Sequence, residues 1–299
     1  MVSNLPIRRV FLSRRLFALL SLGSRLEACA PLRPLSCSRW FALSSVIAGL
    51  AVLTPCALSA GDDVSADSWA QRGLAAEKNR DPLTALGCFQ RANELKPGNA
   101  FILQRLSRQY SDCTVRESSP EKRRQLSESA LLYSRQAYEL EPKNPVYVLS
   151  MAICYGKLGL YGDARTRVEN ARLIKQFADE ALALDPNYDW AHHVLGRWNR
   201  EVADLGGAKR FFAGLLYGGL PKASYEEAIR HLEKAVELSP SVAAHHVELG
   251  FAYAAAGRQA DARREWKAGL ALPVREIHDE DAQRRAREAL GLPVDSEKK

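Results

Sequence analysis

The feature that most constrains this chain is a pattern of small and large residues that recurs at a spacing of roughly 34 residues. The first copy, counted from Ala66, places Trp69, Gly73, Ala85, Phe89, Ala92 and Pro97 at positions 4, 8, 20, 24, 27 and 32. The last copy, counted from Ala243, places Leu249, Gly250, Tyr253, Gly257, Ala262 and Trp266 at positions 7, 8, 11, 15, 20 and 24. Small residues at positions 8, 20 and 27 let two helices approach closely, and the large residues fill the space between neighbouring pairs. The pattern therefore predicts stacked pairs of helices.

The spacing and the residue types resemble the tetratricopeptide repeat, a unit of two helices. One such pair cannot bury its apolar faces alone, so several pairs stack around a continuous core. The period-two alternation that would indicate strands is not sustained. We therefore expect an all-α, right-handed superhelical solenoid of about five tetratricopeptide-like helix pairs, with a C-terminal capping helix at residues 279–290.

Three of the units are longer than the usual pitch. The second has a polar insertion at residues 114–124, which predicts a surface loop or an extended helix start, and the third has a long second helix at residues 163–186. The fourth is split by an insert at residues 203–222. We expect this insert to form an extra helix at residues 207–217, which Gly218, Gly219 and Pro221 would end. Its apolar side chains should turn inward against the solenoid, namely Phe211, Phe212, Leu215 and Leu216.

The positive charge of the chain is concentrated near its N-terminus. Residues 1–60 contain seven arginines and one acid, so the totals of 42 basic and 35 acidic residues leave 35 and 34 for the remainder. A nucleic-acid-binding protein would carry its basic patch on the folded domain. The net charge of +7 therefore does not indicate nucleic acid as a partner.

The same N-terminal leader contains an uncharged stretch, Trp40–Ala60, and it allows three interpretations. It could be an export signal cleaved near Ala57, Ser59 and Ala60, an uncleaved membrane anchor, or part of an organelle transit peptide. Pro55 and the small residues after it favour export or anchoring, with organelle targeting as the alternative. The chain thus divides into a targeting or membrane-anchor leader, a tetratricopeptide-like helical repeat domain and a polar tail, at residues 1–61, 62–291 and 292–299.

The split fourth unit carries a more specific resemblance. Residues 171–240 combine an LGRW core, a basic and aromatic insert, a Gly-Pro turn and a YEEA helix start. The residues concerned are Leu195, Gly196, Arg197, Trp198, Lys209, Gly218, Pro221, Tyr225, Glu226, Glu227 and Ala228. Together they resemble the helical domain of the regulator of microtubule dynamics family, and the similarity extends over residues 66–291. The resemblance implies a helical-repeat fold and no catalytic residues. Some members of that family are anchored to membranes at the N-terminus, which is compatible with Trp40–Ala60 as an anchor.

The sequence contains no motif that indicates an enzyme. His192-His193 and His245-His246 are adjacent pairs, whose side chains diverge by about 100° on a helix and cannot hold one metal ion as a unit. Residues 205–209, LGGAK, lack the spacing of a phosphate-binding loop. We therefore expect no catalytic residue, no metal, no cofactor and no small-molecule substrate. Cys88, Cys113 and Cys154 are widely spaced and should pack as small apolar side chains.

The first helices of the repeat units should line an inner groove that binds a partner. The residues expected there are Glu77, Lys78, Lys157, Trp190, His193, Arg197, Arg200 and Phe251. Arginines beside an aromatic ring suit an acidic or C-terminal peptide, because a guanidinium binds a carboxylate through two hydrogen bonds. The competing interpretation is that these side chains are solvated or pair with one another. We therefore expect a non-enzymatic scaffold or adaptor for a protein or peptide partner, with possible membrane contact through the leader. The alternative is a membrane- or lipid-contacting helical domain that works through the insert 203–222.

Overall fold

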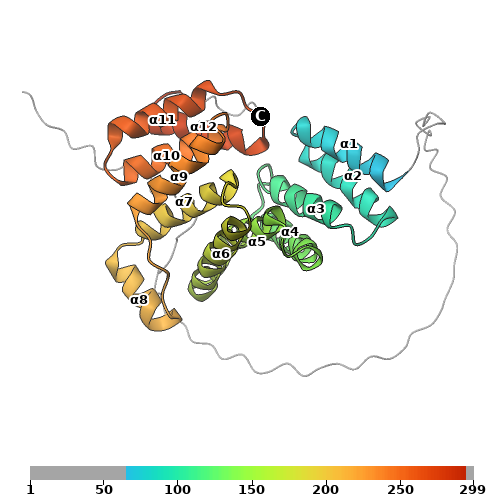
Figure 1. The fold of residues 1–299 in the computed structure, drawn as a ribbon, viewed down its shortest axis with the longest axis horizontal. Helices are drawn as coiled ribbons and strands as arrows, with labels where there is room; N and C mark the ends of the chain where they lie inside the picture. The colour runs from blue at the N-terminus through green and yellow to red at the C-terminus, as the bar shows by residue number, and fades with distance from the viewer. Residues whose placement is uncertain (1–64, 294–299) are drawn as a thin grey trace, which may run out of the picture. The chain divides into compact units, whose positions relative to one another are not determined.

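A computed structural model describes residues 65–293 of the chain, and these residues form α-helices and no strands (Figure 1). The leader with its apolar stretch Trp40–Ala60, and the end of the tail, lie outside the described residues. The helices are α1 (Ala66–Lys78), α2 (Pro82–Leu95), α3 (Ala100–Cys113), α4 (Pro120–Leu140), α5 (Pro145–Leu158), α6 (Ala164–Leu184), α7 (Asp189–Ala203), α8 (Gly207–Tyr217), α9 (Tyr225–Leu238), α10 (Ala243–Ala255), α11 (Gln259–Ala271) and α12 (Ile277–Leu290). No helix within residues 65–293 is long and apolar enough to cross a bilayer.

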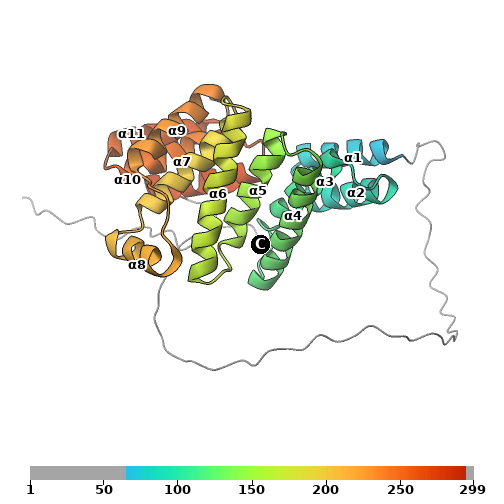
Figure 2. The same cartoon turned by 60° about the horizontal axis from the view of Figure 1, so that its bottom comes forward.

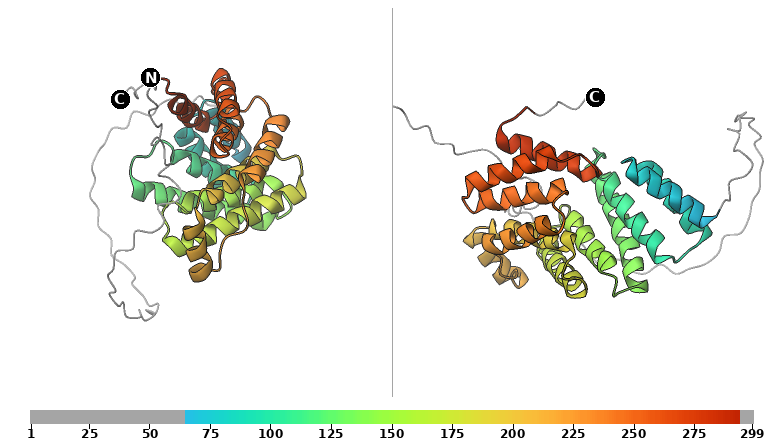
Figure 3. Two further views of the ribbon diagram at one scale, coloured as in Figure 1. Left: turned by 90° about the vertical axis from the view of Figure 1, so that its left-hand side faces the viewer. Right: turned by 45° about the horizontal axis from the view of Figure 1, so that its top comes forward.

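The helices pack as five pairs followed by a single helix. The pairs are α1 with α2, α3 with α4, α5 with α6, α7 with α9, and α10 with α11, and α12 packs against both helices of the last pair. The first helices of successive pairs also contact one another, from α3 to α5, α7 and α10. Figure 3 shows the pairs following one another from α1 to α12. The predicted all-α solenoid of helix pairs is confirmed for the described part of the chain.

The repeated glycine is required because the aromatic residue of the partner helix occupies its side-chain position. A Cβ atom added to Gly73 of α1 would lie 2.7 Å from the ring of Phe89 on α2. In the last pair, a Cβ atom on Gly250 would lie 2.5 Å from the indole Nε1 of Trp266. Phe89 is fully buried and Trp266 is 5% exposed, so neither ring has room to move away. The glycine at position 8 and the aromatic residue at position 24 therefore mark the point at which the two helices of a pair cross closely.

Prolines end the second helices of four pairs in the same way. The last residue before each proline has φ between −136° and −140° and ψ between 72° and 97°, which is outside the helical region. These residues are Lys96, Glu141, Asp185 and Ser239. A proline ring clashes with a helical residue before it, so the helix has to end at that point.

Two of the long units follow the sequence-based expectation. The polar insertion at residues 114–124 is a loop up to Ser119 and then the first turn of the 21-residue helix α4. The long second helix of the third unit is α6, which also has 21 residues. Cys88, Cys113 and Cys154 are buried free thiols, as expected.

The insert of the fourth unit is a helix with the predicted bounds, but its orientation was predicted wrongly. The side chains of Phe211, Phe212, Leu215 and Leu216 are 66%, 47%, 68% and 57% exposed, whereas we expected them to face inward. The buried residue of α8 is Ala213, on the opposite side of the helix. The orientation differs because α8 is fixed to the solenoid by hydrogen bonds from arginine side chains to main-chain carbonyl oxygens near its ends, and by a small contact with α6. Figure 2 shows α8 beside α6 and apart from the other pairs.

Candidate functional site

The inner surface, by which we mean the side formed by α1, α3, α5, α7 and α10, carries the residues that the sequence indicated. Four of them lie on α7 and one, Phe251, on the neighbouring helix α10. Lys157 lies on α5, and its pKa is lowered by burial and also by the nearby charge of Arg197. Glu77 and Lys78 lie at the end of α1, where Glu77 contacts α3 and Lys78 is exposed. The structure therefore brings Trp190, His193, Arg197, Arg200 and Phe251 together and leaves the α1 residues separate.

A buried ion cluster holds α7, α10 and α12 together. Glu248 of α10 is 2% exposed, and its Oε1 accepts a hydrogen bond of 2.5 Å from Nη2 of Arg200. Its Oε2 lies 3.2 Å from Nη1 of Arg285 on α12. Burial alone would raise the pKa of Glu248, but Arg200 and Arg285 outweigh burial and hold that pKa well below its ordinary value. Arg200 is thus a buried partner of Glu248, and it is not accessible to a ligand.

Arg197 differs from Arg200 because its side chain remains 42% exposed. Its Nε donates to Oε1 of Glu201 at 2.8 Å, which is an ordinary pair between residues four apart on one helix. The side chain of Lys157, by contrast, has two polar contacts within the chain. Its Nζ donates to the carbonyl oxygen of Ser111 at 2.6 Å and lies 3.1 Å from Oγ1 of Thr114. Arg197 is therefore the most accessible cation among the predicted residues of α5 and α7.

Aromatic and imidazole rings pack beside this arginine at the start of α7. The ring of Trp190 lies 5.1 Å from that of His193 and 4.8 Å from that of His245, measured between centroids. Nδ1 of His193 is 3.0 Å from Nδ1 of His245, whose Nε2 is 3.2 Å from Oδ2 of Asp189. His245 thus links the imidazole of His193 to the carboxylate of Asp189. Burial and the neighbouring His245 lower the pKa of His193 to about 3, which keeps this imidazole neutral.

The other members of the two adjacent histidine pairs, His192 and His246, occupy equivalent places in their repeats. Nε2 of His192 lies 3.1 Å from the carbonyl oxygen of Pro186, and Nε2 of His246 lies 2.9 Å from that of Pro240. Each imidazole thus binds the turn that ends the preceding helix. Adjacent histidines point to different partners, as expected from their spacing. Within residues 65–293, no group of three or more His, Cys, Asp or Glu side chains is arranged to hold a metal ion.

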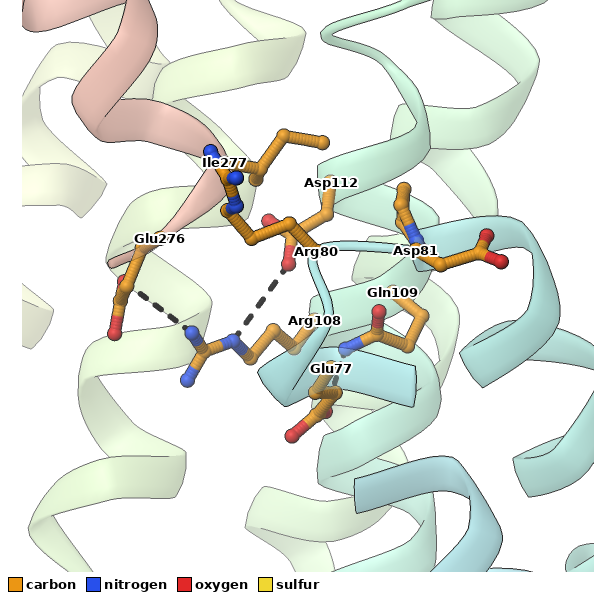
Figure 4. Close-up of a pocket in the computed structure, with 9 residues that line it drawn as sticks. Glu77, Arg80, Asp81, Arg108, Gln109, Asp112, Glu276 and Ile277 are labelled. Carbon is orange, nitrogen blue, oxygen red and sulfur yellow. Dashed lines mark hydrogen bonds and ion pairs between the residues drawn. The ribbon is translucent and has the colours of Figure 1, made fainter. Parts of the chain in front are cut away.

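A polar seam joins α12 to the N-terminal pairs, and no sequence pattern indicated it (Figure 4). We use "the seam" for the contacts of Arg80, Arg108 and Asp112 with the residues at the start of α12. Nη2 of Arg108 lies 3.2 Å from Oε2 of Glu276, and Nη1 of Arg80 lies 2.6 Å from Oε1 of Glu280. Nε2 of His278 lies 2.8 Å from Oδ1 of Asp112. These pairs are separated by 166 to 200 residues along the chain, which is why no local pattern could indicate them.

A partly open cavity of about 30 Å³ lies at the seam, lined by residues from α1, the α1–α2 turn, the start of α2, α3 and the start of α12. Such a volume suits a water molecule rather than a substrate, whose pockets usually measure hundreds of Å³. Glu77 lines this cavity and is bound by Nε2 of Gln109 at 2.5 Å and by Nη1 of Arg105 at 3.2 Å. Phe251 lies beneath α12, with the guanidinium of Arg285 at 4.4 Å from its ring centroid. Part of the predicted groove is therefore filled by the chain's own side chains.

Comparison with known proteins gives matches of two kinds. The family described as "Regulator of microtubule dynamics protein 1-3" matches residues 65–292. The regulator of microtubule dynamics protein 3 of Xenopus laevis is 30% identical over 198 residues, which cover 66% of this chain and 42% of that protein. The mouse (Mus musculus) regulator of microtubule dynamics protein 1 is 30% identical over 141 residues, covering 47% of this chain and 46% of that protein. The chain thus spans less than half the length of these relatives.

Among solved structures, a tetratricopeptide-repeat protein from Thermus thermophilus matches with a TM-score of 0.56. The two sequences are 18% identical, and the match covers 76% of this chain and 100% of that one. A likeness at this identity concerns the fold alone. It agrees with the helix pairs described above and identifies them as tetratricopeptide-like repeats.

Proposed function

This chain belongs to the regulator of microtubule dynamics family, and we propose from that premise that it is a non-enzymatic scaffold that binds an acidic peptide on its inner surface. The fold and the family are those of interaction proteins, in which stacked helix pairs present an extended binding face. The relatives are more than twice as long as the stretch that they share with this chain, so the proposal concerns the shared helical domain alone.

The observation that carries the proposal is the unequal exposure of the charged side chains on the inner surface. Three acids of α1, α3 and α10 are largely covered, with side-chain exposures of 13% for Glu77, 10% for Asp112 and 2% for Glu248. The guanidinium side chains of Arg197 and Arg108 remain 42% and 37% exposed, and Lys78 at the end of α1 is exposed as well. At Arg197 an incoming peptide therefore meets a guanidinium group that is more exposed than its partner Glu201, which is 12% exposed. Guanidinium groups favour carboxylates, which they can bind through two hydrogen bonds.

Arg197 is the residue on which the binding of such a peptide should depend. The rings of Trp190 and His193 lie on the same helix and offer an apolar surface next to the charge. A carboxylate would bind the exposed part of the Arg197 guanidinium, beside the existing pair with Glu201. The bound form thus needs no rearrangement of the buried Arg200–Glu248 pair.

The test is binding to an array of fluorescent acidic peptides that carry a free C-terminal carboxylate, an amidated C-terminus, or lysine in place of the acids. Arg197→Ala should weaken binding of the acidic peptides by about tenfold or more, because a hydrogen bond to a charged group contributes roughly 1.5–3 kcal/mol. Arg165→Ala is the matched control, since Arg165 also pairs with a glutamate four residues on but lies on the second helix of its pair. Binding that ignores peptide charge, or equal losses in the two variants, would reject the proposal.

We also propose that residues 1–61 direct the chain to export or anchor it in a membrane, with organelle targeting as the alternative. The support is the uncharged stretch Trp40–Ala60 after an arginine-rich segment. Mass spectrometry of the N-terminus of the mature protein separates these routes. A start near Gly61 contradicts the anchor, and an intact leader contradicts cleavage.

A further inference from the structure

The insert helix α8 presents an apolar face to solvent. Successive residues of a helix are about 100° apart, so Phe211, Phe212, Leu215 and Leu216 fall within one arc of about 140°. All four side chains are between 47% and 68% exposed. Ala213 and Tyr217 lie on the opposite side, which faces the solenoid and is the less exposed one. A helix of 11 residues with four large apolar side chains in water is a feature that needs a partner.

Two arginines, one on α6 and one on α8 itself, hold α8 in this orientation. Nε of Arg172, on α6, donates to the carbonyl oxygen of Gly219 at 2.8 Å, and its Nη2 donates to that of Tyr217. Arg210, on α8 itself, donates from Nη2 to the carbonyl oxygen of Val202, near the end of α7, at 3.0 Å. These bonds fix both ends of α8 and make no use of the apolar face. The outward orientation is thus determined by hydrogen bonds that do not require the four side chains.

The charge of the insert identifies the kind of surface that it fits. Residues 205–222 contain Lys209, Arg210 and Lys222 and no acid. Lys209 and Lys222 are exposed, and Lys209 precedes the apolar face by two residues. An apolar helical face flanked by lysines is the composition of helices that lie in the interface of an anionic bilayer.

We propose that α8 docks on an anionic membrane surface, with its four apolar side chains at the level of the acyl chains and Lys209 and Lys222 among the headgroups. This site is separate from the inner surface, because α8 lies outside the five helix pairs. A protein partner or a second copy would need roughly 800 Å² of matched surface on each side. A single helix about 16 Å long offers less than that, whereas a bilayer needs no matched shape.

The test measures amide hydrogen exchange of residues 207–217 in the full chain, because a local signal is not confused with membrane binding by the leader. The chain is mixed with vesicles of phosphatidylcholine alone or with roughly 30% phosphatidylserine. We expect α8 to be protected by the anionic vesicles only, and the protection to weaken at high salt.

Two variants and a control complete the experiment. Phe211→Ser with Leu215→Ser should raise the lipid concentration for half-maximal protection at least about tenfold, which corresponds to 1.4 kcal/mol. Lys209→Glu with Lys222→Glu should remove the preference for anionic vesicles. Leu83→Ser, on α2, replaces a leucine that is 71% exposed and should change nothing.

Three results would overturn the proposal. Equal protection by the two kinds of vesicle would reject the role of the lysines, and no protection by either would reject membrane docking. Protection of α8 without lipid would show that a second copy or the leader covers the face, depending on whether the protection rises with protein concentration.

Discussion

At the residue scale, the glycines at position 8 of the repeats decide how closely the two helices of a pair can approach. Gly250 and Gly73 leave room for a large ring from the partner helix, and the ring then fills the space between the helices. Other glycines have no such role: nothing lies within 4 Å of a Cβ atom added to Gly87 on α2. The same residue type is therefore indispensable at one position and replaceable at another.

This contrast gives a matched pair of substitutions. Gly250→Ala should lower the free energy of unfolding by about 1–3 kcal/mol, because the new Cβ atom overlaps the indole of Trp266. Gly87→Ala should leave it unchanged or raise it by about 0.5–1 kcal/mol, since alanine is the better helix former. Urea denaturation measures both. A loss for Gly87→Ala equal to that for Gly250→Ala would contradict the packing argument.

At the element scale, the histidines connect helices of neighbouring repeats. Nδ1 of His192 on α7 is 2.9 Å from Nδ1 of His231 on α9, and the His193–His245 pair joins α7 to α10. Burial lowers the pKa of His231 to about 4, and the charge of Arg230 adds to this shift. Each pair therefore contains one imidazole, that of His193 or His231, which the fold keeps neutral.

Stability should consequently decrease as the pH falls from 7 to 5. Histidines of the unfolded chain take up protons near pH 6.5, whereas His193 and His231 stay neutral in the fold until about pH 3 and 4. The unfolded state then binds more protons, and the free energy of unfolding should fall by roughly 1–2 kcal/mol per histidine. His246 opposes this trend because Glu265 raises its pKa. The pKa of Asp189 is about 2, so that acid titrates below this range.

Urea denaturation at several pH values between 5 and 7 tests this prediction. His231→Gln should make the pH dependence shallower, because one group with a lowered pKa is removed. Stability that rises as the pH falls would contradict the assignment of neutral imidazoles.

The elements also show what the sequence could and could not predict. The helix pairs and the bounds of α8 followed from periodicity, proline and glycine, which act locally. The orientation of α8 could not be predicted, because periodicity states which side chains share a face and not what that face meets. The hydrogen bonds from the Arg172 side chain to main-chain carbonyl groups decide the orientation, and nothing in the sequence links an arginine of α6 to carbonyl groups some 45 residues later. Among the predicted groove residues, the burial of Arg200 depended on Glu248, 48 residues away.

At the scale of the whole repeat domain, two kinds of contact hold α12. It packs against α10 with apolar residues such as Ala282 and Ala286, which are 6% and 0% exposed. It meets the N-terminal pairs through the seam, which consists largely of ion pairs. Partly exposed ion pairs contribute about 0–1 kcal/mol each and weaken with salt. The seam is therefore the weaker of the two attachments.

The seam should open before the domain unfolds. At about 1 M salt the screening length falls to about 3 Å, so amide hydrogens near Glu276 should exchange faster while those of α10 and α11 stay protected. Arg108→Ala should have the same effect at low salt, because it removes the partner of Glu276. Arg165→Ala serves as the control, since Arg165 lies on α6 and not at the seam. Equal acceleration in α10 and α11 would show that α12 is not released separately.

The return of α12 to the first pairs also bears on how this protein can vary in length. An open solenoid can gain or lose a repeat at little cost, because each unit contacts only its neighbours. Here the last helix meets Arg80 and Arg108 only after five pairs, so one more pair or one fewer would move α12 away from them. The geometry of the seam thus matches a domain of five pairs, whereas an insertion within a pair, as at α8, leaves the seam in place.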